Sequence, residues 1–254
     1  MKFLSAVSGL SARQKAWSDM AYDILVAEYE QTWADVGDSK GTDGADITRR
    51  YYRRYEIVQE RVTAGAVKDN GDELACRKGC SHCCHNQVTA PAHELLTLAE
   101  RIQHMPEDQR GRIMERIASN AVRVDSMTPQ EAQRAPLRCP LLGEDDACMA
   151  YDDRPSPCRR YHSLSYARCE DSFMNPRDFL SRIPLSTPLL VASEAQYLGF
   201  RKVLGERGID TRYYEMNTAL REALSAGDAC GQRLGGGEPA FVHAVCYDDP
   251  VGAK

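Results

Sequence analysis

The sequence has no long apolar segment and no excess of basic residues. No run of about eighteen apolar residues occurs, which is roughly the length that a helix needs to cross a bilayer. The net charge is −5, so the chain has no surplus of positive charge with which to bind nucleic acid or an anionic membrane. We therefore expect no membrane-spanning segment, and we do not expect nucleic acid as a main partner.

The chain also lacks the residue groupings of several common enzyme classes. It contains no Ser/His/Asp grouping with supporting context, no glycine-rich phosphate-binding loop and no pair of carboxylates with an arguable role. It does not alternate strands and helices as a βα-barrel does. The sequence therefore predicts no particular reaction.

The first residues carry little of what an export signal needs. A single lysine precedes a short apolar segment that serines interrupt, and a helical pattern begins soon afterwards, at about Gln14. A secretory signal has a more continuous apolar core. We expect a cytoplasmic protein, in which cysteines stay reduced and are available to bind metal.

Helical periodicity dominates most of the sequence, and no strand alternation of useful length is present. Proline near the first turn and glycine past the last periodic residue mark several helix ends. Thr128 and Glu131 have the spacing of a capping box, and Asp210 is expected to cap the last helix. The expected helices lie at about residues 11–36, 47–66, 91–102, 106–122, 128–134, 187–204 and 210–224.

One irregular region interrupts this pattern. Between about residues 136 and 174 the periodicity lapses, and Pro, Gly, Asp and Cys dominate. Metal bound by the cysteines would supply the contacts that such a stretch lacks. We expect a mainly α fold in which helices frame a loop-rich, metal-stapled cysteine core. The expected single compact unit consists of an N-terminal helical extension (1–70), the cysteine core (71–175) and C-terminal helices with a glycine-rich tail (176–254).

Arginines and tyrosines are interleaved in the second expected helix. This mixture can bind single-stranded nucleic acid, because aromatic rings stack on bases and guanidinium groups follow the phosphates. In a net acidic chain we favour the alternative, in which the tyrosines pack beneath a solvated arginine face. The residues are Arg49, Arg50, Tyr51, Tyr52, Arg53, Arg54 and Tyr55.

Eight of the ten cysteines lie between residues 76 and 169. Cys80 and Cys83 have the two-residue gap of a metal knuckle, in which a tight turn directs two thiolates at one ion. Cys83 and Cys84 are adjacent, and adjacent side chains seldom reach one tetrahedral ion without strain. This pair favours two nearby sites or one polynuclear cluster. The eight candidate ligands, enough for two sets of four thiolates, are Cys76, Cys80, Cys83, Cys84, Cys139, Cys148, Cys158 and Cys169.

The spacing leaves open which metal is bound, because zinc and iron–sulfur clusters both accept four thiolates. Nearby cations would stabilise the negative charge of such a site, and Arg154, Arg159 and Arg160 are close in sequence. His82 and His85 could each replace a thiolate, although the cysteines suffice without them. Cys230 and Cys246 lie in no motif, and we expect both to be small buried residues.

Two motifs together resemble those of a known family. The first is Cys76-x3-Cys80-x2-Cys83-Cys84, and the second is Cys139-Pro-Leu-Leu followed by Cys148-x2-Tyr151-x2-Arg154-Pro155-x2-Cys158-Arg159-x-Tyr161. Over about residues 74 to 170 the chain is similar to the bacterial family of zinc- or iron-chelating cysteine-cluster proteins. The resemblance implies a cytoplasmic protein that binds zinc or iron, or an iron–sulfur cluster, through these eight cysteines.

Two other functions remain open beside metal binding. Some proteins with a similar cluster resemble flagellin lysine methylases, and the spacing of Cys76, Cys80 and Cys83 is also that of radical S-adenosylmethionine enzymes. The extra adjacent Cys84 and the mainly α chain argue against the usual barrel of those enzymes. In the second alternative, zinc stabilises a module whose flanking helices bind a protein partner.

Overall fold

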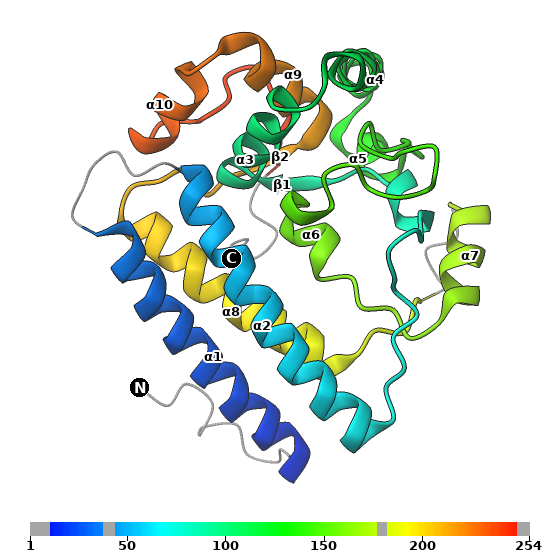
Figure 1. Cartoon of the computed structure of the whole chain (residues 1–254), viewed down its shortest axis with the longest axis vertical. Coiled ribbons are helices and arrows are strands. Elements are labelled where there is room, and N and C mark those ends of the chain that lie inside the picture. Colours follow the sequence, from blue (N-terminus) through cyan, green and yellow to red (C-terminus); the bar gives the residue numbers. More distant parts are fainter. Residues whose placement is uncertain (1–10, 38–43, 177–181, 248–254) are drawn as a thin grey trace.

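The computed structural model describes residues 11–37, 44–176 and 182–247 (Figure 1). Within these ranges the chain is mainly helical, as the sequence predicts. The longer helices are α1 (Ala12–Val36), α2 (Gly44–Asn70), α3 (Ala92–Gln103), α4 (Glu107–Asp125), α8 (Thr187–Glu206) and α9 (Met216–Ala226). The short helices are α5 (Pro129–Arg134), α6 (Ser156–Arg159), α7 (Tyr166–Met174), α10 (Ala229–Gly235) and the 3-10 turns η1 (His82–His85) and η2 (Tyr151–Asp153).

A small antiparallel sheet joins distant parts of the chain. It consists of β1 (Thr89–Pro91), β2 (Tyr213–Glu215) and β3 (Cys246–Tyr247), in that order. The sequence pattern predicts no strands, because alternation cannot be recognised in two or three residues. Among the described residues, none of the helices combines the length and apolar character needed to cross a membrane.

Local signals placed most of the helices correctly. The capping box at α5 is formed: the Thr128 hydroxyl accepts from the Glu131 N–H at 3.3 Å, and the Glu131 carboxylate accepts from the Thr128 N–H at 2.8 Å. Each cap satisfies backbone donors that the first turn of a helix leaves without partners. These caps depend only on neighbouring residues, so sequence alone predicts them well.

The prediction for the C-terminal helix was wrong in one respect. Asp210 does not cap it, because the chain first forms β2, and the Glu215 carboxylate then caps α9 by accepting from the Thr218 N–H at 2.7 Å. Asp210 is buried and instead accepts from the Tyr214 hydroxyl at 2.7 Å and the Ala240 N–H at 2.8 Å. It therefore ties the C-terminal segment to the sheet, a long-range role that the local sequence does not show.

Three apolar clusters form the core. The first lies among α3, α4, α9 and α10, the second lies between α2 and α8, and the small third cluster joins the end of α4 to α5 and Leu137. Figure 1 shows α1, α2 and α8 along one side of the molecule, with the cysteine-bearing segments on the other side of α2. In the second cluster the rings of Tyr51 and Phe200 stack with their centroids 4.2 Å apart. The helices therefore form the frame against which the irregular segments lie; the division into three parts stays a prediction.

The tyrosines of the arginine–tyrosine helix are packed in the core as predicted, but the arginine face is largely ion-paired rather than only solvated. Tyr51, Tyr52 and Tyr55 are buried in the second cluster. Three of the four arginines are used in ion pairs within the protein: Arg49 with Glu100 and Asp153, Arg50 with Asp35 and Asp46, and Arg54 with Glu28 and Asp35. These guanidinium groups stabilise contacts between elements of this chain.

Helices α1 and α8 approach closely at one glycine. A Cβ added at Gly199 would lie 2.4 Å from the Leu25 carbonyl oxygen and 3.1 Å from the Tyr29 nitrogen. Both obstructing atoms belong to the backbone of α1, so no side-chain rotation can make room for a methyl group. Only glycine permits this helix separation.

We expect Gly199→Ala to lower the free energy of unfolding by about 2 kcal/mol, because the added methyl group forces α1 away from α8. Urea denaturation measures this change. Gly205→Ala in the same helix is the matched control, since no atom lies within 4 Å of its added Cβ. The control should be neutral or gain about 0.5 kcal/mol from the higher helix propensity of alanine. Equal effects of the two substitutions would show that the close approach is not limiting.

Candidate metal centre

The two cysteine-bearing segments meet through their backbones. The Cys139 N–H donates to the Cys84 carbonyl at 2.7 Å, and the Leu137 N–H donates to the His85 carbonyl at 2.9 Å. Asn86 and Pro136 form an antiparallel bridge beside them. The 3-10 turn η1 and the segment after α5 are thus joined, although α3 and α4 separate them in the sequence.

A second backbone contact attaches the chain just before Cys76 to the chain just after Tyr161. The Ala75 N–H donates to the Ser163 carbonyl at 2.8 Å. The Cys76 sulfur accepts from the Ser163 N–H at 3.2 Å and donates to the Tyr161 carbonyl at 2.9 Å. The Cys169 thiol donates to the Ser163 hydroxyl at 3.1 Å. Ser163, which is fully buried, therefore connects Cys76 with Cys169, and nothing in the sequence marks this role.

A tight turn presents the predicted knuckle. Gly79 has a φ of 87°, which a residue with a Cβ rarely adopts, and the Cys80 N–H closes the turn on the Arg77 carbonyl at 3.1 Å. The turn leads directly into η1, which carries Cys83 and Cys84. The glycine before Cys80 thus has the conformational role that the spacing predicts.

The first sulfur group consists of Cys139, Cys148 and Cys158, which all lie in the irregular stretch after α5. Burial raises the pKa of Cys139 above its ordinary value, and the nearby Cys158, Cys148 and Cys83 raise it further. Burial, with Cys83 and Cys148, raises the pKa of Cys158 to about 12. Mutual influences of this kind require sulfurs that lie close together. Cys83 therefore lies beside the first sulfur group.

The second sulfur group consists of Cys76, Cys80 and Cys169. Burial raises the pKa of Cys76, and Cys169, Cys83 and Cys80 raise it further. Burial also raises the pKa of Cys169, together with Cys80 and Cys83. Cys83 is therefore close to this group as well as to the first. A hydrogen bond with Cys84, followed by burial, raises the pKa of Cys83 itself.

Backbone donors and arginines stabilise the charged form of these thiols. The Leu141 N–H beside Cys139 and the Ala150 N–H beside Cys148, each two residues further on, lower the pKa of these cysteines against the effect of burial. Such N–H donors are common partners of metal-bound thiolates. In donor chemistry and in surroundings, the residues fit a thiolate-bound metal.

The arginines near the cysteines have two different roles: some lie beside the thiols, and one forms an ion pair with α8. Arg154 opposes the effect of burial on the pKa of Cys83, Cys148 and Cys158, and Arg159 does so for Cys148. Arg160 forms an ion pair with Glu194 of α8 at 2.5 Å instead. Two of the three arginines that the sequence indicated therefore lie close enough to stabilise thiolates.

The sulfurs are gathered but not all directed at one point. Over residues 11–37, 44–176 and 182–247, no three His, Cys, Asp or Glu side chains are arranged to hold one metal ion together. Ligation would therefore require rotation of some cysteine side chains within the groups. The structure shows the helical frame and the loop-rich core, whereas the metal staple and the eight ligands stay predictions.

The histidines of η1 contact aromatic rings. His82 lies 5.0 Å from Tyr166 and 5.4 Å from Phe173 between ring centroids, and His85 lies 4.8 Å from Phe173. Both aromatic residues belong to α7, a helix that the sequence analysis placed in an irregular stretch. These contacts hold α7, and with it Cys169, against η1.

The two remaining cysteines lie apart from the groups. Cys230 is fully buried in the first core cluster and its sulfur accepts from Arg233 at 3.3 Å, so its predicted burial is confirmed. The prediction of burial was wrong for Cys246, which is exposed on β3. The reason is that β3 lies at an edge of the small sheet.

Comparison with known proteins identifies the cysteine-bearing region. Residues 75–178 match the family model of the CxxCxxCC domain, described as a "putative zinc- or iron-chelating domain". The match contains both cysteine segments and α7, and it agrees with the family resemblance of the two motifs. No curated protein and no solved structure matches the chain significantly.

Proposed function

From this zinc- or iron-chelating domain, we propose that the protein binds zinc or iron through its eight clustered cysteines, the iron as an iron–sulfur cluster. The observation that carries the proposal is the backbone contact that joins the two cysteine-bearing segments, in which the Cys139 N–H donates to the Cys84 carbonyl at 2.7 Å. In agreement with it, Cys83 raises the pKa of thiols in both sulfur groups. Thiolates are the preferred ligands of both candidate metals in proteins.

The arrangement supports a centre with more than one metal atom. Each sulfur group would supply three cysteines. Cys83 raises the pKa of thiols in both groups, and the carbonyl of the adjacent Cys84 accepts from the Cys139 N–H of the first group. One thiolate from this pair would complete each set of four. The adjacency of the two cysteines, which would strain a single tetrahedral site, suits two neighbouring sets.

The residues of the chain have defined tasks in this proposal. The Leu141 and Ala150 N–H groups orient sulfurs, and Arg154 and Arg159 offset the negative charge of the thiolates. Bound zinc would supply a redox-inactive crosslink, and an iron–sulfur cluster would add one-electron chemistry. In both cases binding would fix the irregular stretch that carries the second segment.

Elemental analysis of anaerobically purified protein tests the proposal. We expect either colourless protein with about two zinc ions per chain, one for each set of thiolates, or coloured protein with iron and acid-labile sulfide. An absorption spectrum distinguishes the two results. Protein that contains neither metal, and that takes up neither when it is offered under reducing conditions, would contradict the proposal.

A further inference from the structure

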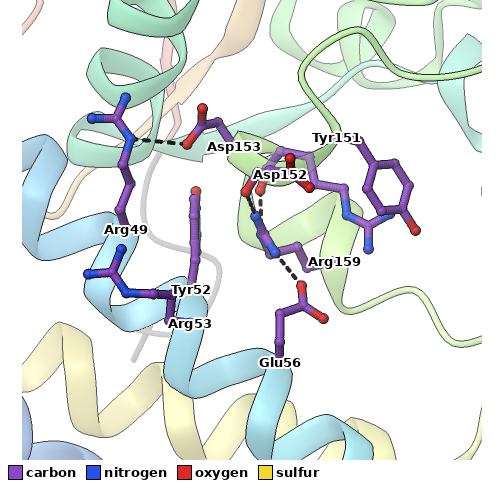
Figure 2. A pocket seen from close by; sticks show the side chains of 9 residues that line it. Arg49, Tyr52, Arg53, Glu56, Tyr151, Asp152, Asp153 and Arg159 are labelled. Carbon is purple, nitrogen blue, oxygen red and sulfur yellow. Dashed lines mark hydrogen bonds and ion pairs between the residues drawn. The ribbon is translucent and has the colours of Figure 1, made fainter.

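A cavity of about 450 Å³ lies beside the candidate metal centre (Figure 2). One wall is α2, and the other is the segment 151–159, which includes η2 and α6. This segment lies between Cys148 and Cys158 in the sequence, so the cavity and the first sulfur group share a wall. Two of the four arginines that line it, Arg49 and Arg53, belong to α2 and lie outside the family motif.

Several polar side chains that line the cavity already have hydrogen-bond or ion-pair partners within the protein. The Arg159 guanidinium lies over the Tyr52 ring at 3.9 Å and donates to the Glu56 carboxylate and the Asp152 carbonyl (Figure 2). Arg49 donates to the Asp153 carboxylate at 3.2 Å. These contacts fix both walls, so the remaining polar groups are held in place before any ligand arrives.

Three groups of the lining are left without polar partners. The Tyr52 side chain is 3% exposed, yet its hydroxyl has no hydrogen-bond partner among the described residues. The Arg154 Nε is also buried without a partner, and its guanidinium stacks 3.8 Å above the Tyr151 ring. Arg53 makes no ion pair with any described residue, unlike the three other arginines of the same helix. Buried polar groups are normally paired, so the Tyr52 hydroxyl and the Arg154 Nε call for a partner, whereas the exposed Arg53 adds an unpaired positive charge at the rim.

The direction of the Tyr52 hydroxyl is consistent with a hydrogen-bond partner supplied by a ligand. In Figure 2 the ring stands between the Arg49 and Arg159 sides of the cavity, and the hydroxyl points away from the α2 backbone toward η2. The hydroxyl thus lies buried between the two walls, at the edge of the cavity. A ligand oxygen that enters between the walls would accept a hydrogen bond from it.

The charged side chains that line the cavity indicate which charge the ligand should carry. Arg49 and Arg159 are balanced by Asp153 and Glu56, which leaves Arg53 and Arg154 as positive groups and Asp152 as a negative one without an ion pair among the described residues. A surplus of positive charge favours an anion, and Asp152 disfavours a strongly charged one such as a polyphosphate. Guanidinium groups suit carboxylate and phosphate oxygens.

We propose that this cavity binds a small organic oxyanion of low charge through the Tyr52 hydroxyl and the Arg53 and Arg154 guanidinium groups. The ligand carries one carboxylate or phosphate group. This function goes beyond metal binding, because none of these residues is a candidate metal ligand. Arg154 would serve both the anion and the neighbouring thiolates, whereas Tyr52 and Arg53 would serve the anion alone. The shared wall places the anion next to the first sulfur group.

Isothermal titration calorimetry on the full chain with its native metal content tests the proposal, with acetate and inorganic phosphate as separate probes. We expect saturable binding of at least one probe, and the tighter one identifies the group that the ligand carries. Tyr52→Phe and Arg53→Gln should each weaken binding about tenfold, because each removes a hydrogen bond to a charged group. Arg61→Gln, an exposed arginine of α2 outside the cavity, should leave binding unchanged.

Thermal denaturation separates a ligand site from a structural role of Tyr52. Without probe, Tyr52→Phe should be at least as stable as the wild type, because the substitution removes a buried hydroxyl that has no partner. With probe, its gain in melting temperature should be smaller than that of the wild type. The proposal is overturned if neither probe saturates the wild type, or if Arg61→Gln weakens binding as much as Arg53→Gln.

Elemental analysis of the same variants keeps this test separate from that of the metal. Tyr52→Phe and Arg53→Gln should retain the metal content of the wild type while binding the probe more weakly. Weaker probe binding that occurs only together with loss of metal would count against a separate site. Absence of metal from the wild type with intact probe binding would contradict the proposed function and leave the cavity assignment supported.

Discussion

Replacing Cys83 with serine is expected to remove most of the bound metal. Cys83 is the sulfur that lies close to both groups, so its loss would affect both sets of thiolates. A serine hydroxyl is not ionised at neutral pH and is a poor ligand for zinc or for an iron–sulfur cluster. Elemental analysis after gel filtration measures the metal per chain. Limited proteolysis between residues 136 and 174 should also become faster, because the irregular stretch loses its crosslinks.

Cys246→Ser provides the control for this experiment. Cys246 is exposed on β3 and lies in neither sulfur group, so its substitution should leave the metal content unchanged. Cys230→Ser should also retain metal, although burial of a hydroxyl in the core can lower its stability. Full metal content in the Cys83 variant would refute its assignment as a ligand.

Arg54→Ala is expected to lower the free energy of unfolding by about 3 kcal/mol. The Glu28 carboxylate is 3% exposed and accepts from Arg54 Nε at 3.0 Å and Nη2 at 2.6 Å. Without the arginine, a buried negative charge keeps only the neutral donors Thr32 and Gln196. Breaking one side of a buried ion pair is costly for this reason. Urea denaturation measures the change.

A neighbouring arginine offers a matched comparison. Arg50 lies on the same helix and pairs with Asp46 and Asp35, but its side chain is much more exposed than that of Arg54. Water solvates the partners of an exposed pair when one member is removed, so Arg50→Ala should cause a much smaller loss. Equal losses would show that the burial of Glu28 does not determine the effect.

The sequence predicted those features of the fold that depend on neighbouring residues. The longer helices and the capping box at Thr128 are examples, since a periodic apolar face and a cap are visible over a few positions. Helix α7 was missed because its nine residues lie among cysteines and prolines and bury no side chain fully. Asp210 was assigned to the wrong element because its partners, Tyr214 and Ala240, belong to the sheet and the tail.

In the candidate metal centre, too, the sequence predicts what neighbouring residues determine and misses what long-range contacts determine. The motifs predict which cysteines to consider and that Arg154 and Arg159 help them, and the structure brings these residues together. The two sulfur groups could not be predicted, because their membership depends on backbone contacts such as that between Cys84 and Cys139. The missing partner of the Tyr52 hydroxyl is likewise visible only when both walls of the cavity are in place.

The backbone contact between Cys84 and Cys139 also has a consequence for the order of folding. It closes a long loop that contains α3, α4 and α5, and closing such a loop costs chain entropy before any new contact compensates for it. The docking of α3 on α4 would shorten the effective loop and thereby favour assembly of the helices before Cys84 and Cys139 meet. Metal would then enter a centre whose halves have already met. The speed of its capture would be set by helix docking rather than by encounter with the ion.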